Sequence, residues 1–481
     1  MKKIRFIARF EKTIDINILK NAVLDKCLLF LLFTNVFCVM GKNSEAATWY
    51  LDASARGRNN GTSWVDSWSS VTQINWNNIQ PGDTLLVQGG MYPNDLNITN
   101  KSDITVRIAP NATEQAVFFG SSLYNLHNCL IDGYLNGKQY LKITKKHAVL
   151  NNALTIRESR NLTIRGIEID RSSEFHEDTQ PVNGVQVNGA QDFIIFEYNY
   201  IHHTTGDGIN FTHPPSQERN AYDSYIIRFN KITNIGDDAV QNAMQTSIHD
   251  NFFDKNGFMT YFGAHPDGFQ SFSGKLGPSA NYKIYNNVIK GFNQNIFIEY
   301  ARSNVLIYNN ILIGGNTKGT DRGINYSYWD FFTGTFLIAN NIMYNFLSFL
   351  SWNGGLPASA VVGNNIFLNC KLIASPGTGI FLDKTNIYWD TANVQYYNTE
   401  GIPVGISSNR YAGDSVYKDP KFESLDSFKL QKDSPAIGTG KNLNNYFTTD
   451  FVGAFRGEKW DIGVYQHSDG ISAPKGLKVI Q

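Results

Sequence analysis

The chain has 481 residues, and its 42 basic and 42 acidic residues cancel to a formal net charge of zero. A general affinity for nucleic acids or for anionic membrane surfaces depends on a basic excess, so the composition argues against both partners. The length exceeds that of an ordinary compact domain, but a solenoid escapes this limit because each coil packs only on its neighbours.

The N-terminal region has the order of a secretory signal peptide. An apolar run from Cys27 to Met40 follows basic residues and precedes small residues near Ala47. The basic residues are Lys2, Lys3, Arg5, Arg9, Lys20 and Lys26. The apolar run is shorter than the roughly 20 residues that a membrane-spanning helix needs. We expect a signal peptide over 1–47, no stable membrane insertion after its cleavage, and a secreted or cell-surface protein. The long basic region leaves two alternatives open, a misassigned start codon or an uncleaved anchor.

A short pattern then recurs along the chain, in which a strand-like run ends in Asn, one residue and an apolar residue. It occurs at 196–201, 227–232, 248–253, 284–289, 307–312, 338–343 and 362–367. The recurring residues are Asn199, Asn230, Asn251, Asn287, Asn310, Asn341 and Asn365. In stacked coils, strands lie ~4.8 Å apart, so each side-chain amide can bond the next Asn in a ladder. The pattern therefore predicts a parallel β-helix.

A second series of strands lies about half a coil from the Asn turns. Aligning these strands places one residue of each in a column: Asn183, Asp207, Asp238, Asp267, Asn295 and Arg322. A neighbouring column contains amides and is interrupted by one apolar residue: Gln186, Asn210, Gln241, Gln270, Ile298 and Asn325. We interpret the amide column as structural, because stacked amides can bond one another without a ligand.

Two cysteines follow the predicted signal peptide, Cys129 and Cys370. They are far apart in sequence and would lie on distant coils, so we expect two buried thiols rather than a disulfide. No Cys/His spacing typical of a metal site is present in the sequence.

These features resemble the pectin-lyase-like β-helix superfamily over residues 48–467. The stretch 49–92 is similar to the opening coil of secreted members, and 434–466 is similar to their closing coil. The resemblance implies an all-β, single-stranded right-handed parallel β-helix in one domain, followed by a tail or linker stub at 468–481. We expect a monomer.

The acidic column marks the candidate site. Asp207, Asp238 and Asp267 would repel one another at coil spacing, and some of their pKa values must rise unless a cation compensates. Asp237 stands beside Asp238. Histidines gather in the same region: His202, His203, His213, His249 and His265. A lone Asp at such a turn often only caps it, but three in one column favour a functional site.

Residues on the following coils are candidates for substrate binding. Aromatic rings in an open groove can stack on sugars, or they can belong to the core. The aromatic candidates are Tyr300, Tyr326, Tyr328, Trp329, Phe331 and Phe332. Arg302 and Arg322 could bind a uronate carboxylate, and Lys275 is a further candidate.

The first mechanistic interpretation is glycoside hydrolysis of a polysaccharide. The segments TGDG (205–208) and GDD (236–238) are similar to polygalacturonase-type hydrolases, which implies catalytic roles for Asp207, Asp237 and Asp238. His265 stands in for the family histidine in a different local setting, and the Arg-x-Lys element of that family is absent. One Asp would protonate the leaving oxygen while another activates water, without a cofactor.

The second interpretation is β-elimination from a uronic-acid polymer, or the related C5 epimerisation. The four carboxylates Asp207, Asp237, Asp238 and Asp267 would then bind Ca²⁺ against the substrate. The candidate bases are Lys275, His265, Arg302 and Tyr326. A third interpretation is a non-catalytic glycan-binding β-helix, because the fold alone does not imply activity.

Overall fold

The computed structural model describes residues 45–145, 151–172, 181–189, 192–213, 222–241, 244–260, 264–271, 281–299, 303–315, 321–327, 332–353, 360–370, 372–373, 382–389, 396–397, 403–404 and 416–467. The chain divides into two units, residues 1–47 and 48–481. The predicted signal peptide up to residue 44 and the tail at 468–481 lie outside the described residues. Within the described ranges, no helix is long and apolar enough to cross a membrane.

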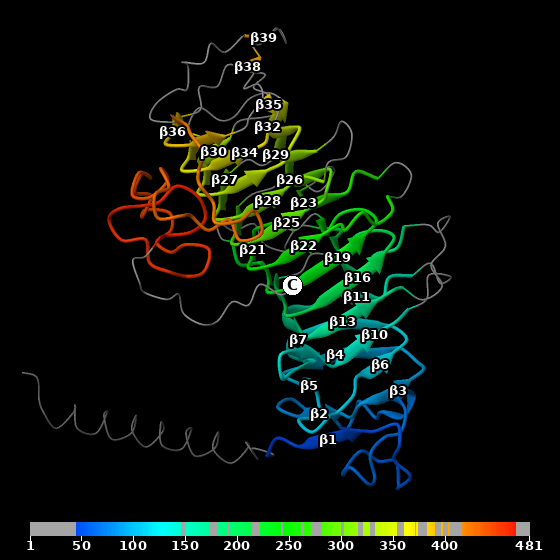
Figure 1. Ribbon diagram of the computed structural model, residues 1–481. Helices are drawn as coiled ribbons and strands as arrows, with labels where there is room; N and C mark the ends of the chain where they lie inside the picture. Colours follow the sequence, from blue (N-terminus) through cyan, green and yellow to red (C-terminus); the bar gives the residue numbers. More distant parts are fainter. Residues whose placement is uncertain are drawn as a thin grey trace, which may run out of the picture. The chain divides into compact units, whose positions relative to one another are not determined.

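The second unit is built from coils whose strands stack in parallel on three faces (Figure 1). Face 1 contains β1 (Thr48–Leu51), β2 (Thr84–Val87), β5 (Thr105–Ile108), β12 (Arg160–Arg165), β15 (Asp192–Glu197), β18 (Tyr225–Arg228), β21 (Thr246–His249), β24 (Tyr282–Tyr285), β27 (Ser303–Tyr308), β30 (Thr333–Ala339), β33 (Val361–Gly363) and β36 (Leu382–Lys384). Face 2 contains β3 (Gly90–Tyr92), β6 (Ala116–Phe118), β10 (Leu141–Ile143), β13 (Ile167–Asp170), β16 (Tyr200–Thr204), β19 (Lys231–Ile235), β22 (Phe252–Asp254), β25 (Val288–Lys290), β28 (Ile311–Ile313), β31 (Ile342–Tyr344), β34 (Ile366–Leu368), β37 (Ile387–Trp389) and β40 (Val416–Tyr417).

Face 3 contains β4 (Leu96–Ser102), β11 (Leu154–Arg157), β14 (Val185–Asn188), β17 (Ile209–Phe211), β20 (Val240–Gln241), β23 (Asp267–Ser271), β26 (Gln294–Glu299), β29 (Arg322–Ser327), β32 (Ser348–Asn353) and β35 (Leu372–Ile373). The long strand β7 (Ser121–Asp132) pairs with β4 and β11 at its start and with β5 and β12 at its end, so it serves faces 3 and 1. Two short antiparallel pairs, β8 (Tyr134–Leu135) with β9 (Lys138–Gln139) and β38 (Tyr396–Tyr397) with β39 (Pro403–Val404), lie outside the three faces, as does the 3-10 helix η1 (Val71–Gln73). This confirms the predicted right-handed parallel β-helix.

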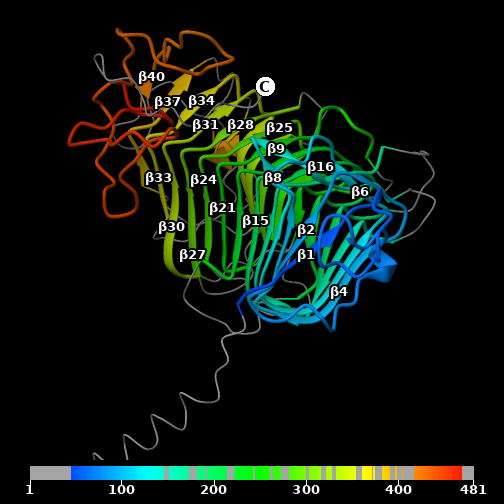
Figure 2. The same cartoon turned by 90° about the horizontal axis from the view of Figure 1, so that it is seen from below.

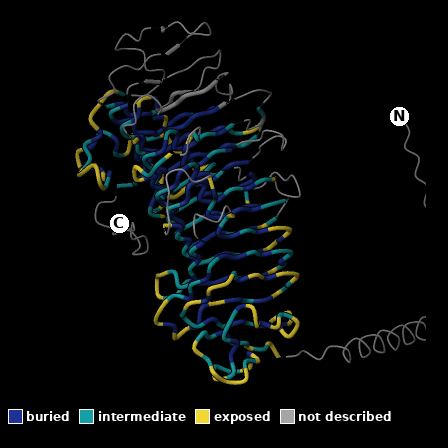
Figure 3. Tube along the Cα trace, turned by 90° about the vertical axis from the view of Figure 1, so that its right-hand side faces the viewer, coloured by how far each residue is buried: buried dark blue, intermediate teal, exposed yellow. Residues whose placement is uncertain are grey.

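Strand alternation explains the core of the helix. In β12, Leu162 and Ile164 are buried while Thr163 and Arg165 are partly exposed, because successive side chains point to opposite sides of a strand. One continuous apolar cluster of inward side chains runs from Leu51 to Tyr388. Figure 2 shows neighbouring strands such as β21, β24 and β27 side by side, and Figure 3 shows buried residues recurring in the coils that are coloured by burial.

The predicted asparagine ladder is confirmed at the turn between faces 1 and 2. In each of the seven predicted positions, the Nδ2 atom donates to Oδ1 of the next Asn at 3.0 Å, and the ladder ends on an eighth residue, Asn386. Each amide also donates to a strand carbonyl of a neighbouring coil, as Asn287 does to Ile248 at 2.9 Å. The ladder therefore satisfies buried polar groups of several coils with one repeated residue.

The C-terminal segment does not stack as the expected closing coil. Instead, Phe428, Phe451 and Ile462 cover the outward side chains Ile342 and Ile366 of face 2. Leu443, Phe447 and Trp460 contribute to a second cluster against face 1. The outward side-chain amides of Asn309 and Asn340 donate to backbone carbonyls of this segment rather than to residues of the next coil. Later coils thus carry apolar outer surfaces that the C-terminal segment buries.

Both cysteines are free and buried, with Cys129 3 % and Cys370 1 % exposed. This confirms the prediction of two buried thiols.

Candidate functional site

The acidic column lies at the turn where the chain passes from face 2 to face 3. Strand register pairs Ile209 with Val240 and Val240 with Phe269, which aligns Asp207, Asp238 and Asp267. The backbone N–H of Asp238 donates to Asp207 Oδ1 at 3.0 Å, and that of Asp267 donates to Asp238 Oδ1 at 2.8 Å. The predicted alignment of the three aspartates is therefore confirmed, and each of the first two side chains also caps the turn of the next coil.

On the coil that follows Asp267, the predicted alignment is wrong by one residue, whereas Arg322 on the next coil lies in the column as predicted. Asp267 pairs with Gln294, and Gln294 pairs with Arg322, so Gln294 takes the place expected for Asn295. Asn295 is fully buried and donates to the carbonyls of Ile289 at 2.6 Å and Ile313 at 3.1 Å. Its amide thus satisfies backbone groups of face 2 and cannot face the site.

The amide column forms a hydrogen-bonded series beside the aspartates. Gln186 donates to Asn210 at 2.9 Å, Asn210 to Gln241 at 2.5 Å, and Gln241 to Gln270 at 3.2 Å. Phe297, rather than the expected Ile298, interrupts the column. These bonds agree with the structural interpretation.

Two of these amides also hold carboxylates of the acidic column. Asn210 Nδ2 donates to Asp207 Oδ2 at 2.5 Å, and Gln241 Nε2 donates to Asp238 Oδ2 at 2.9 Å. The amide column therefore orients the acidic column from the side of face 3.

The three column carboxylates are buried without a compensating ion pair among the residues that the structure describes. Asp207 is 5 % exposed and Asp238 and Asp267 are 0 % exposed. None of the ion pairs within the described part of the chain involves them. Asp267 Oδ1 is buried and has no hydrogen-bond partner among the described residues. When these carboxyl groups ionise, no ion pair among the described residues balances their charge.

Burial is the main cause of the pKa shifts in this column. Burial, with repulsion from Asp237, raises the pKa of Asp207 to about 7. Burial and repulsion by neighbouring aspartates raise the pKa of Asp238 well above its usual value. The pKa of Asp267 is likewise well above its usual value, chiefly because of burial. The sequence predicted this rise from repulsion between the carboxylates, whereas its main cause in the structure is burial.

Asp237 is the most accessible carboxylate of the group. It is partly exposed and accepts a backbone hydrogen bond from His265, which is itself exposed. Burial raises the pKa of Asp237, while the charges of His265 and Lys255 oppose that rise.

Lys255 is a residue that the sequence analysis missed. Its ammonium group donates to the carbonyls of Ile235 at 3.0 Å and Phe258 at 2.8 Å, and burial lowers its pKa to about 8. A lone lysine in a loop carries no motif, so only the fold could identify it.

Three of the carboxylates have a spacing that fits a divalent cation. One oxygen each of Asp207, Asp237 and Asp238 lies within 4.8 Å of the others. A Ca²⁺ ion bound at about 2.3–2.6 Å from each ligand holds oxygens up to about 5 Å apart, and it prefers carboxylate oxygens. The donor set and the uncompensated charge therefore fit a hard cation at this turn.

Other predicted residues have different fates. Arg322 is exposed and lies in the acidic column two coils beyond Asp267, where its charge lowers the pKa of that carboxyl against the larger effect of burial. Tyr326 is only 1 % exposed and packs against Phe336, so its expected role in substrate binding or as a base is wrong. The alternation of β29 explains this, because Asn325 points outward and its neighbour Tyr326 must point inward. Phe332 is partly buried and packs against the core, with its ring centroid 5.6 Å from that of Phe336. The other candidates lie outside the described residues: Lys275, Tyr300, Arg302, Tyr328, Trp329 and Phe331.

The clustered histidines do not converge on the aspartates. His249 lies on face 1, where its Nδ1 atom is 2.7 Å from Asp250. His202 and His203 lie on face 2 in β16, and His213 follows the face 3 strand β17. His265 is the histidine that contacts the acidic group. The clustering of these histidines in the sequence therefore does not bring them together in space, because one coil places residues that are close in sequence on different faces.

No family model matches the chain, and no curated protein matches it in sequence. Among solved structures, it is similar to pectate lyase Pel9A, with 14 % identity, a TM-score of 0.44, and coverage of 88 % of this chain and 97 % of that one. The complex of XylC with xylose has 10 % identity, a TM-score of 0.46, and coverage of 87 % and 98 %. The family PL6 alginate lyase AlyGC has 14 % identity, a TM-score of 0.46, and coverage of 82 % and 57 %. These similarities concern the β-helix fold, and no site residue is transferred from them.

Proposed function

We propose that the chain is a secreted or cell-surface, polysaccharide-active enzyme that performs cation-assisted β-elimination, or the related C5 epimerisation, on a uronic-acid polymer. One observation carries the proposal: carboxylate oxygens of Asp207, Asp237 and Asp238 lie within 4.8 Å of one another, and two of these side chains are buried without an ion-pair partner among the described residues. Such a group favours a divalent cation, and a cation fixed at an acidic turn can receive an anionic substrate.

The residues of the turn have separate tasks in this proposal. Asp207 and Asp238 are held by Asn210 and Gln241, so their oxygens are oriented before any cation arrives. Asp237 offers the accessible carboxylate. A bound Ca²⁺ would neutralise the substrate carboxylate and so acidify the adjacent C–H bond. Arg322, which is exposed in the same column, would bind a further uronate carboxylate through its guanidinium.

Proton abstraction requires a base near Asp237. Among the described candidates, His265 is exposed and adjacent to that carboxylate. A neutral imidazole at this position can take the C5 proton. Lys275 and Arg302 stay proposals of the sequence analysis for the same role, and they lie outside the described residues.

Glycoside hydrolysis is the second candidate, and the pKa of Asp207, about 7, favours it because a general acid must hold its proton near neutral pH. Two contacts weigh against it. Both oxygens of Asp238 accept hydrogen bonds, from Asp267 and Gln241, and the side chain is 0 % exposed. Asp238 is therefore badly placed to activate water. A glycan-binding protein without catalysis is the third candidate.

A substrate panel distinguishes the three functions. The full chain is incubated with neutral and uronic-acid polysaccharides, with either Ca²⁺ or a chelator. Elimination produces an unsaturated uronate that absorbs in the ultraviolet, and hydrolysis produces reducing ends without that absorbance. Glycan binding without either product would refute both enzymatic candidates.

A matched pair of variants then tests the site. Asp237→Asn preserves shape while removing a proposed ligand, and we expect it to abolish the Ca²⁺-dependent product. Asp433→Asn removes an exposed carboxylate that pairs with Lys421 far from the turn, and we expect full activity. Equal activity of the two variants would contradict the assignment of this site.

A further inference from the structure

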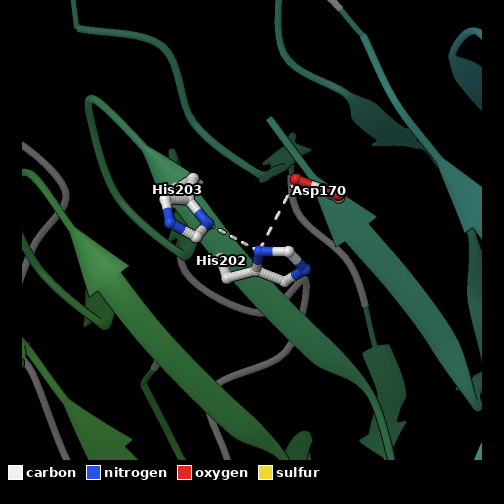
Figure 4. Close-up of side chains that lie close together, drawn as sticks. All are labelled: Asp170, His202 and His203. Atoms are coloured by element: carbon white, nitrogen blue, oxygen red, sulfur yellow. Dashed lines mark hydrogen bonds and ion pairs between the residues drawn. The ribbon is translucent and has the colours of Figure 1, made fainter. Parts of the chain in front are cut away.

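A second group of metal-ligating side chains lies on the outer side of face 2. Asp170 ends β13, and its register partner on the next coil is His202 in β16. Figure 4 shows His202 between Asp170 and His203, with its Nδ1 atom directed toward both. His202 Nδ1 is 2.7 Å from His203 Nδ1 and 3.6 Å from Asp170 Oδ1. One ligand atom from each of the three residues lies within 4.8 Å of the others.

The backbone of β16 brings the two adjacent histidines together. Neighbouring residues of a regular strand point to opposite sides, so His202 and His203 would normally be separated by the sheet. His203 has a φ of 57°, in the left-handed region, which turns its ring to the same side as His202. On the next coil this position is Asn234, with a φ of 56°. Asn adopts this conformation readily, whereas His does so at greater cost.

The surroundings orient both rings. His202 Nε2 lies 3.4 Å from Glu168 Oε1, and the Tyr200 ring stacks on the His202 ring at 4.1 Å between centroids. His203 Nε2 lies 2.9 Å from Asn234 Nδ2. A carboxylate on the far nitrogen of an imidazole is the usual support of a metal-ligating histidine, because it fixes the tautomer. Glu168 therefore holds His202 with Nδ1 toward Asp170 and His203, and the short contact between the two Nδ1 atoms brings His203 to the same point.

Asp170 is held in place from the opposite side. Lys142 Nζ lies 2.8 Å from Asp170 Oδ2 and 2.7 Å from Glu168 Oε1. The Ser172 backbone N–H donates to Asp170 Oδ1 at 2.9 Å, which leaves that oxygen with a further lone pair toward His202. Lys142 balances one of the two carboxylate charges, so Glu168, Asp170 and Lys142 together keep one excess negative charge that attracts a cation.

We propose that Asp170, His202 and His203 bind a divalent transition-metal ion of the Zn²⁺ class, which clips the coil of β13 to that of β16. Two imidazole nitrogens and one carboxylate oxygen form a donor set suited to Zn²⁺ rather than Ca²⁺. Tetrahedral Zn²⁺ with bonds of about 2.0–2.1 Å holds its ligand atoms roughly 3.3 Å apart. The separations of 2.7 and 3.6 Å bracket that value. This site differs in residues and donor chemistry from the acidic turn, so the inference does not rest on the proposed function.

The test is direct metal binding to the full chain, purified without a polyhistidine tag and stripped with a chelator. Calorimetric titration with Zn²⁺ should show one ion per chain, and titration with Co²⁺ should give the visible absorption of a tetrahedral site. His203→Asn should weaken Zn²⁺ binding by more than about 100-fold, and Glu168→Gln by about 10-fold. Asn suits the left-handed backbone at this position, so the variant is expected to fold. If circular dichroism shows otherwise, His202→Gln replaces it.

His249→Asn is the matched control, because His249 pairs with Asp250 on face 1 and belongs to neither group of metal-ligating side chains found among the described residues. We expect it to bind Zn²⁺ as the unchanged chain does. The proposal is overturned if the unchanged chain binds no Zn²⁺, or if the His203 variant binds it as tightly as the control.

Discussion

Replacing Asp207 by Asn should stabilise the protein at alkaline pH when no divalent cation is present. Asp207 is 5 % exposed, and its burial beside Asp237 raises its pKa to about 7 from an ordinary value of 3.8. The folded protein therefore holds this proton more tightly than the unfolded chain does. The stability contribution is complete below pH 3.8 and is lost as the pH rises toward about 7.

The size of the effect follows from that interval. At about 1.4 kcal/mol for each pKa unit, the interval from 3.8 to about 7 corresponds to about 4 kcal/mol of stability lost at pH 8. The Asn variant cannot ionise and avoids this loss. At pH 5 most of the loss has not yet occurred, so the two proteins should be closer in stability there than at pH 8.

Urea unfolding followed by tryptophan fluorescence measures this, at pH 5 and pH 8 with a chelator. Millimolar Ca²⁺ in place of the chelator should then raise the stability of the unchanged chain at pH 8 and have a much smaller effect on D207N, which lacks one of the proposed ligands. Asp433→Asn, at an exposed ion pair, should respond to pH as the unchanged chain does. If the unchanged chain and D207N respond identically to pH in the chelator, burial of an uncompensated carboxylate is not the cause we describe.

Four further predictions address the scaffold and the candidate substrate-binding residues. Asn287→Ala should lower the free energy of unfolding by about 3 kcal/mol, because it removes buried hydrogen bonds to Ile248 and Asn310. Thermal unfolding measures this against the exposed control Asn97→Ala, and equal melting temperatures of the two variants would contradict the prediction. Gly268→Ala should cost about 1–3 kcal/mol, because its Cβ would lie 2.3 Å from Ile289 Cγ2 and 2.5 Å from the Asn295 carbonyl oxygen, and an unchanged melting temperature would contradict this packing. Arg322→Ala should raise KM for a uronate polymer about tenfold with kcat unchanged, as steady-state kinetics would report, since the side chain is exposed. Tyr326→Phe should leave kcat/KM unchanged because the ring is buried, and a large loss would restore Tyr326 as a base.

Much of the scaffold could be predicted because its signals are local and periodic. Asn287 and its ladder partners stand at the same point of successive coils, and a residue that repeats with the coil must stack along the axis. The same reasoning aligned Asp207, Asp238 and Asp267, since their strands share one residue pattern. Mutual repulsion follows from stacking, so the direction of the pKa shifts could be predicted, whereas the burial that is their main cause became visible only in the structure.

The errors arose where one residue changes the outcome. Asn295 and Gln294 are adjacent, and only the pairing of Asp267 with Gln294 decides which of them enters the acidic column. Tyr326 was predicted to bind substrate, although the outward position of Asn325 implies that the Tyr326 side chain points inward. In a strand, a shift by one residue moves a side chain to the opposite face, so pattern matching without hydrogen-bond register cannot resolve it.

The sequence by itself determined the β-helix, the asparagine ladder and the acidic column, because these depend on repetition along the chain. Only the tertiary structure decided what surrounds them. Lys255 lies in a loop that brings its charge near Asp237. The left-handed backbone of His203 places its ring on the same side as that of His202, whereas regular strand alternation would separate the two rings. The C-terminal segment buries the outer surface of the later coils. These arrangements depend on contacts between distant segments and on single backbone angles, for which no sequence period exists.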